Sequence, residues 1–262
     1  MLTSRIAMQI ACSRRPIKQA LTTAARLGAR AVEIDARHDL RVRELTQTGV
    51  RQLKKLLDDL DLKVSAIRFP TRRGYDTDED LDRRVTATQA AMRFARQLGT
   101  DVVINHVGTV APDDDDPSWR LLVEVLTGLG DYGHRVGSRI AAATGPAGGE
   151  ELARLIAALP DEAIGVHLDP LGLILAGHSV VDTVTRLGPA IVHVWANDGV
   201  RDVGAGRGIE VELGRGVVDY PALLATLEEI DYRGWLTVAR RQTEDPAADL
   251  GAAVQYLANL AA

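Results

Sequence analysis

Four residues that can do chemistry lie in one short segment, HVWAND at residues 193–198, at the end of an apolar run. Imidazole and carboxylate groups placed together can hold a metal ion or transfer protons, and an indole offers a flat face to a sugar. Polar residues end the other apolar runs in the same way: Glu33, Asp35, Arg68, Asn105, His106, Asp169 and Arg240. A fold that gathers the ends of these runs would build one site from them.

Eight short apolar runs are typical of β-strands that are buried on both faces. We expect these strands at residues 5–10, 31–36, 63–69, 101–107, 139–144, 164–169, 191–197 and 235–240. Stretches with apolar residues at three- and four-residue spacing separate them and predict helices. Three of these helices end in Leu-Gly, at Gly28, Gly99 and Gly188, where glycine can adopt the left-handed conformation that stops a helix.

Alternating strands and helices without a linker predict a single (β/α)₈ TIM barrel over residues 1–262. The alternative is a doubly wound open sheet. No G-x-G-x-x-G follows the first strand, which disfavours that alternative, and we interpret GAGRG at 204–208 as a flexible loop. In a barrel, the polar strand ends meet at the C-terminal mouth, where active sites lie. Strand alternation places His167 with Asp169, and His193 with Trp195, on shared faces.

Composition restricts the class of partner. The chain has 262 residues and a net charge of −5, without a block of basic residues, so we expect no nucleic-acid partner. No apolar run has the roughly 20 residues of a membrane span, so no membrane partner is expected. Cys12 is the single cysteine, so no intramolecular disulfide can form, and we expect it to pack in the core. These features favour a cytoplasmic protein and leave open whether it forms a homo-oligomer.

Three segments carry a resemblance to a known family. They are HLDPLGLILAG at 167–177, HVWAND at 193–198 and LGRGVVDYPALLATLEEIDYRGWLTV at 213–238. They resemble the xylose isomerase-like TIM barrels, which include sugar and sugar phosphate isomerases and epimerases and the endonuclease IV group. The resemblance covers nearly the whole chain and implies a sugar isomerase or epimerase fold.

The resemblance also implies a divalent metal, Mn, Mg, Zn or Co, held by Glu, Asp, His and Glu on the last four barrel strands. In this chain the four positions are Ala143, Asp169, Trp195 and Ala239, so only Asp169 keeps a ligand-type residue. One carboxylate does not hold a catalytic metal ion, and a methyl group cannot carry a proton. We therefore expect no cofactor, and a degenerate metal site typical of a pseudoenzyme. An inward Asp169 needs a partner, for which His193 or Arg240 could serve.

Arginines accumulate at the predicted mouth, where guanidinium groups could bind phosphate or carboxylate. These arginines are Arg68, Arg72, Arg73, Arg201, Arg207, Arg215, Arg240 and Arg241. The predicted ligand-binding residues are Arg68, Trp195, Asp198, Arg201 and Arg240. Arg240 directly follows an empty ligand position but has outward parity, so it reaches the mouth only if the strand end bends. Arg201 is the alternative. The expected ligand is a small polar or anionic molecule such as a sugar or sugar phosphate.

Three other functions stay open. An active isomerase or epimerase with a rearranged site would use Glu33, His106, Asp169 or His193 as catalytic residues. An endonuclease IV-like DNA repair enzyme is disfavoured by the net charge and by the missing zinc ligands. A barrel whose mouth is plugged by Trp195 could be a structural or partner-binding protein. The fold alone does not choose among these functions.

Overall fold

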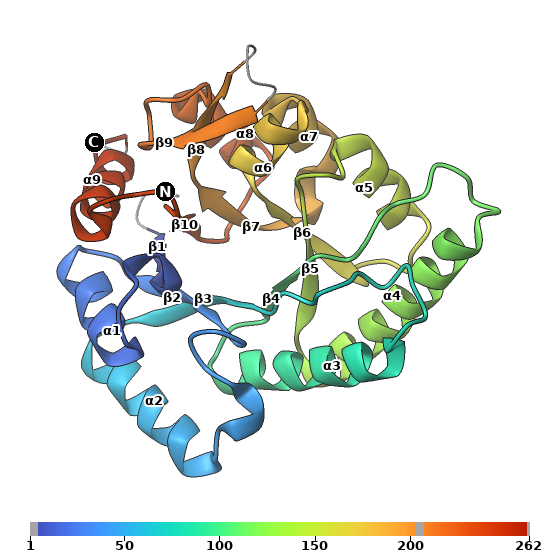
Figure 1. Ribbon diagram of the computed structural model, residues 1–262, viewed down its shortest axis with the longest axis horizontal. Helices are drawn as coiled ribbons and strands as arrows, with labels where there is room; N and C mark the ends of the chain where they lie inside the picture. Colours follow the sequence, from blue (N-terminus) through green and yellow to red (C-terminus); the bar gives the residue numbers. More distant parts are fainter. Residues whose placement is uncertain (1–4, 203–206, 261–262) are drawn as a thin grey trace.

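Eight parallel strands close into a barrel in the order β1-β10-β7-β6-β5-β4-β3-β2 (Figure 1). The structure is a computed structural model that describes residues 5–202 and 207–260. The barrel strands are β1 (Ile6–Gln9), β2 (Ala31–Asp35), β3 (Lys63–Arg68), β4 (Val102–Asn105), β5 (Arg139–Ala143), β6 (Ile164–Leu168), β7 (Ile191–Ala196) and β10 (Leu236–Val238). Each lies inside one of the eight predicted ranges, and the predicted (β/α)₈ barrel is confirmed.

Helices surround the barrel as an outer ring (Figure 1). They are α1 (Ile17–Arg26), α2 (Gln47–Asp59), α3 (Leu81–Gln97), α4 (Pro117–Val136), α5 (Gly149–Ala157), α6 (Pro170–Ala176), α7 (Val180–Leu187), α8 (Tyr220–Glu229) and α9 (Pro246–Asn259). Short 3₁₀ turns lie at Ile10–Ser13, Val42–Glu44 and Gly188–Ala190. Among the described residues, no helix is long and apolar enough to cross a membrane.

Local sequence explains where several helices begin and end. Gly28 and Gly99 follow α1 and α3 with φ of 91° and 86°, the left-handed backbone that glycine adopts without steric cost. Asp116, Asp169 and Asp245 each precede a proline at the first helical position, and each side chain accepts a hydrogen bond from an amide of the first turn. The glycine stops and the Asp-Pro segments therefore fix where these helices end and begin.

An antiparallel hairpin follows β7, formed by β8 (Asp198–Asp202) and β9 (Arg207–Val211). It packs against α6, and a Cβ on Gly199 would lie 2.4 Å from the Leu171 side chain. The loop predicted for GAGRG at 204–208 is therefore wrong at residues 207 and 208, which begin β9. Residues 204–206 lie outside the described part of the chain.

The buried side chains form two separate apolar clusters. The larger cluster fills the space between the strands and the helices. The smaller one contains Ala66, Val102, Ile104 and Ala141, and alternation along the strands places these side chains inside the barrel. The barrel interior is thus filled with aliphatic side chains at this level, and a layer of polar side chains lies nearer the mouth.

Candidate active site at the barrel mouth

A hydrogen bond crosses the barrel from Trp195 on β7 to Glu33 on β2. The indole Nε1–H donates to Glu33 Oε2 at 2.5 Å, and both side chains are buried. β2 and β7 are not neighbours in the barrel, because β1 and β10 lie between them. The contact therefore passes through the interior, and Trp195, only 3% exposed, fills the centre of the mouth.

Glu33 is held by a second donor on β1. Gln9 Nε2 donates to Glu33 Oε1 at 2.5 Å, and the Cys12 thiol donates to Gln9 Oε1 at 2.9 Å. Burial raises the pKa of Glu33 to about 7, although both hydrogen bonds and the charges of Arg68 and Arg241 oppose the rise. The carboxyl group is therefore close to half ionised near neutral pH. Burial also raises the pKa of the Cys12 thiol to about 12, so this cysteine stays a thiol in the core.

Two histidines lie directly beneath Trp195. His167 Nδ1 and His193 Nδ1 are 2.9 Å apart, and His193 Nε2 is 2.8 Å from Thr237 Oγ1. The His167 ring packs edge-on against Trp195 with centroids 4.4 Å apart. Burial lowers the pKa of His193 to about 3 and lowers the pKa of His167 well below its ordinary value. Both histidines are therefore neutral, hydrogen-bonded residues of the barrel core.

Two arginines face the indole ring of Trp195. The Arg241 guanidinium carbon lies 4.5 Å from the ring centroid, and that of Arg68 lies 5.9 Å away. Arg68 is paired with Asp35 at 2.7 Å. For Asp35, burial alone would raise the pKa, but hydrogen bonds from Arg37 and His38 and the charge of Arg68 outweigh burial and lower it. Arg241 forms no ion pair within the described residues, so its charge is available at the mouth.

The hairpin determines which arginine after β10 reaches the mouth. Glu210 on β9 accepts hydrogen bonds from the backbone amides of Arg241 and Gln242. Arg240 is turned toward α9, where its Nε lies 3.3 Å from Asp249, and its Nη1 lies 3.6 Å from Glu210. The structure thus brings Arg241 over Trp195 and pairs Arg240 with two carboxylates. The end of β10 does not bend over the mouth, as it would have to for the Arg240 guanidinium to reach a ligand there.

The four positions that the family resemblance assigns to metal ligands lie on the last four barrel strands. Ala143 ends β5, Asp169 follows β6, Trp195 lies on β7 and Ala239 follows β10. Ala239 is beside β7, since its amide donates to Ala196 O. In the described ranges 5–202 and 207–260, no group of three or more His, Cys, Asp or Glu side chains is arranged to hold a metal ion.

Asp169 has partners other than those expected. Its Oδ1 accepts from Asn197 Nδ2 at 2.7 Å and from the Gly172 amide at 3.0 Å, which caps α6. The expectation that His193 or Arg240 would be its partner is therefore wrong. Burial raises the pKa of this carboxyl group despite these hydrogen bonds. Because it caps a helix, Asp169 has a structural role that does not depend on a metal ion.

Other predicted site residues lie away from Trp195. Asp198 is buried and accepts backbone amide hydrogen bonds from the segment after the hairpin. Arg201 is on β8, near the Gly177 turn that ends α6. His106 is exposed after β4, and Arg215 pairs with Glu212 at 2.7 Å. Arg207 begins β9, and its side chain is not among those that the structure describes.

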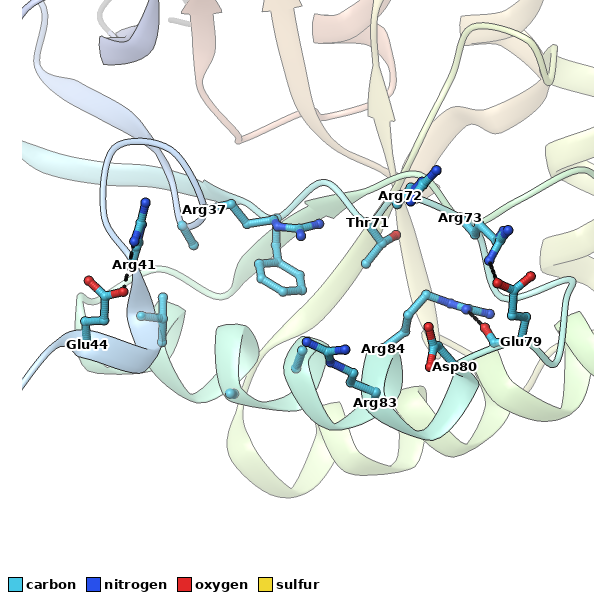
Figure 2. A pocket seen from close by; sticks show the side chains of 15 residues that line it. Arg37, Arg41, Glu44, Thr71, Arg72, Arg73, Glu79, Asp80, Arg83 and Arg84 are labelled. Carbon is cyan, nitrogen blue, oxygen red and sulfur yellow. Dashed lines mark hydrogen bonds and ion pairs between the residues drawn. The ribbon is translucent and has the colours of Figure 1, made fainter.

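Arg72 and Arg73, predicted at the mouth, line a separate groove beside it. Figure 2 shows this groove, which lies between the segments after β2 and β3 and the first half of α3. Neither Trp195 nor Arg68 lines it. The arginines expected at one mouth therefore do not gather at one site.

The sequence did not single out Gln9 or Glu210. Gln9 is a polar residue at the end of an otherwise apolar strand, and this was the available signal. Glu210 lies in the hairpin, which the sequence interpretation did not place, so its contact with the Arg241 backbone had no sequence signal.

A closed parallel barrel with polar side chains at its C-terminal mouth defines a (β/α)₈ TIM barrel. The chain belongs to the xylose isomerase-like TIM barrel family, whose sequence profile matches residues 21–260. The family resemblance of the sequence is confirmed. No curated protein sequence matches the chain.

Solved structures of the same fold cover nearly the whole chain. A xylose isomerase domain protein from Planctomyces limnophilus is 25% identical, with a TM-score of 0.82, over 92% of this chain and 91% of that one. A xylose isomerase-like TIM barrel protein from Mycobacterium smegmatis, in complex with magnesium, is 16% identical with a TM-score of 0.77, over 98% and 97%. The 3-keto-D-glucoside 4-epimerase of E. coli is 15% identical with a TM-score of 0.78, over 97% and 99%.

Proposed function

We propose that this barrel binds a small polar, carbohydrate-like ligand, anionic rather than neutral, at its mouth and without a metal ion. The observation that carries the proposal is the position of Trp195. Its ring occupies the place of a family metal ligand, is fixed by Glu33 and faces Arg241. The protein is then a repurposed member of a sugar isomerase and epimerase family, and not a metal-dependent isomerase.

The donor set at the four family positions does not fit a divalent ion. Ala143 and Ala239 offer methyl groups, and Trp195 offers an N–H donor that is already bonded to Glu33. The remaining carboxylate, Asp169, is engaged by Asn197 and by the N-terminus of α6. Catalytic metal sites need about three protein ligands, and this mouth has one ligand-type residue. Metal-assisted proton transfer next to a carbonyl group therefore has no support in this chain.

Two charges favour an anion at the mouth. Arg241 is exposed and unpaired among the described residues, and Arg68 keeps part of its guanidinium exposed beside Asp35. A phosphate or carboxylate held by Arg241 over the indole would form a charge-assisted hydrogen bond worth about 1.5–3 kcal/mol. The E. coli relative acts on a 3-keto-D-glucoside, which supports a ligand of the sugar class.

Calorimetric titration with glucose 6-phosphate and glucose tests the proposal. The phosphorylated sugar is expected to bind more tightly, and Arg241→Ala to weaken it about tenfold or more. Arg186→Ala, which removes an exposed arginine from α7, is the matched control and leaves affinity unchanged. Equal affinity for the two sugars, or no loss in Arg241→Ala, would contradict the proposal and favour a plugged, structural barrel.

An active epimerase with a rearranged site is the second candidate. It is favoured by Glu33, because a pKa of about 7 suits a general base. Against it, both carboxylate oxygens are hydrogen-bonded and the side chain is fully buried, so a substrate reaches it only if Trp195 moves. Exchange of sugar C–H protons in D₂O, followed by NMR with wild type and Glu33→Gln, distinguishes the two candidates. The binding proposal expects no exchange with either protein.

The cytoplasmic location and the homo-oligomer considered from the sequence stay predictions. An endonuclease IV-like activity has no support in the mouth, where the described residues place no cluster of metal ligands. A mouth that binds another kind of ligand, or none, would be recognised by the result of the titration with glucose 6-phosphate and glucose.

A further inference from the structure

A groove of about 500 Å³ lies outside the barrel mouth, between the segments that follow β2 and β3 and the helix α3 (Figure 2). The ion pair between Asp35 and Arg68 ends these two strands, and neither residue lines the groove. The volume is within the range of about 300–1,000 Å³ that small-molecule sites occupy. This groove is therefore a separate candidate site on the same face as the mouth.

The groove is strongly basic in a chain whose net charge is −5. Its arginines are Arg37, Arg41, Arg72, Arg73, Arg83 and Arg84. Three acidic residues, Glu44, Glu79 and Asp80, also line it. Two of the acids are paired within the groove, Glu44 with Arg41 and Glu79 with Arg73. Arginine is in excess by three charges, six against three, so the groove has a net positive charge.

Several of its donors have no acceptor in the described part of the chain. Arg72 and Arg83 are exposed and have neither an ion pair nor a side-chain hydrogen bond there. Arg37 donates one N–H to Pro70 O at 2.6 Å and keeps its other donors. Arg84 donates to the backbone of Thr77 and Glu79, but its Nε is buried without a partner. Arginine donors without acceptors, lining one groove, suit a planar or tetrahedral oxyanion.

The groove also has an apolar floor. Ala36, Phe69, Ala87 and Ala90 line it, and the guanidinium carbon of Arg37 lies 5.9 Å from the Phe69 ring centroid. In Figure 2, Arg37 and Arg83 extend into the groove from different elements, the β2–α2 segment and α3. Both arginines and this apolar floor line the same groove. An apolar or aromatic body attached to the anion would be buried there.

We propose that this groove binds a phosphate monoester with an apolar or aromatic body, the phosphate held by Arg37 and Arg83 and the body lying on the alanines and Phe69. The N-terminus of α3 also favours an anion in the groove. It lies at the groove, and the side chain of its capping residue, Asp80, makes no capping hydrogen bond. Its dipole favours negative charge at that end. The proposal does not depend on what the mouth binds.

Calorimetric titration with adenosine monophosphate, inorganic phosphate and adenosine tests the proposal. The monophosphate is expected to bind more tightly than inorganic phosphate, since its base lies on the apolar floor, and adenosine to bind weakly or not at all. Arg83→Ala removes an exposed side chain without a partner in the described residues, and it is expected to weaken binding of the monophosphate about 10-fold to 100-fold. Arg186→Ala on α7 is the control for loss of one positive charge.

Protein NMR with the same ligand locates the site. Shifts at residues 36–42, 69–73 and 79–90 are expected, whereas the amide and indole signals of Trp195 are expected to stay unchanged. Unchanged affinity in Arg83→Ala, or binding lost in Arg241→Ala but kept in Arg83→Ala, would overturn the groove proposal. The second result places the anion at the mouth and supports the proposed function, so the two proposals fail separately.

Discussion

At the scale of single residues, Glu33 and Trp195 form a buried hydrogen bond across the barrel interior. A fully buried carboxyl group is costly to ionise, and two donors, Gln9 and Trp195, offset only part of that cost. The part of this cost that the donors do not offset raises the pKa of Glu33 to about 7. Neutral His193 and His167 complete the interior, so the charge of this layer depends on Glu33 and not on the histidines as pH rises through 7.

Glu33 gives the folding stability a pH dependence of known sign. Its pKa is about 7 in the folded protein and near 4.5 ordinarily, so its stabilising contribution is fully present below pH 4.5 and lost as pH rises through 7. Glu33→Gln removes this dependence. From pH 5 to pH 8, the variant is expected to gain about 2–3 kcal/mol in free energy of unfolding relative to wild type. Urea unfolding at both pH values measures this difference.

The two buried histidines act in the opposite direction and cancel in that comparison. Their lowered pKa values make the stability fall as pH decreases below the ordinary histidine value of 6.5, in wild type and variant alike. Glu228→Gln on α8 changes an exposed carboxylate and is the matched control. A difference between Glu33→Gln and wild type that does not change with pH would show that Glu33 is ionised throughout.

At the scale of elements, the β8–β9 hairpin positions Arg241 and is itself held by Asp198. The buried Asp198 side chain accepts from the amides of Gly199, Gly214, Gly216 and Val218, at 2.8–3.2 Å. A carboxylate that accepts from four backbone donors, two of them buried, joins the hairpin to the segment leading into α8. The element that fixes the mouth arginine therefore depends on one residue whose role is structural.

Asp198→Ala is expected to lower the free energy of unfolding by about 3 kcal/mol, because it leaves four amides, two of them buried, without an acceptor. The same change is expected to increase hydrogen exchange of the amides of residues 199, 214, 216 and 218. Asp219→Ala removes an exposed helix cap nearby and is expected to cost about 1 kcal/mol. Equal losses in the two variants would mean that the amides find other acceptors.

Strand alternation predicted the inward residues of the barrel well. Glu33, His193 and Trp195 were expected at strand ends and share the interior, because a two-residue period fixes which side chains face inward. Arg240 and Arg241 show the limit of this reasoning. Both follow β10, and the choice between them depends on Glu210, which is 31 residues away in a hairpin that glycine-rich sequence made look like a loop.

At the scale of the whole molecule, the chain concentrates positive charge on one face although its net charge is −5. Arg241 lies over the mouth, and six arginines line the neighbouring groove. Both positions follow the C-terminal ends of barrel strands, where the βα segments of this fold form its sites. The mouth and the groove therefore lie on the same face of the barrel, the face on which both proposed anion sites are placed.

The stability of the whole barrel is expected not to depend on a bound metal ion. A ligand that binds only the folded state stabilises it, so removing a resident metal would lower the Tm. With Ala143, Trp195 and Ala239 at the family's ligand positions, we expect less than about 0.1 equivalents of Mn, Zn or Mg by elemental analysis, well short of one ion per site, and no change in Tm with EDTA. Near-stoichiometric metal at this mouth would contradict the prediction.

Restoring ligand residues at the family's positions tests whether the Trp195 ring is what prevents metal binding. Ala143→Glu with Ala239→Glu is expected not to restore metal binding, because the Trp195 ring still fills the third position and its N–H points at Glu33. Adding Trp195→His supplies the missing nitrogen ligand beside Asp169 and vacates the ring volume, so the triple variant is expected to bind Mn²⁺. Circular dichroism shows whether each variant folds. Metal binding by the double variant would show that the indole does not block the site.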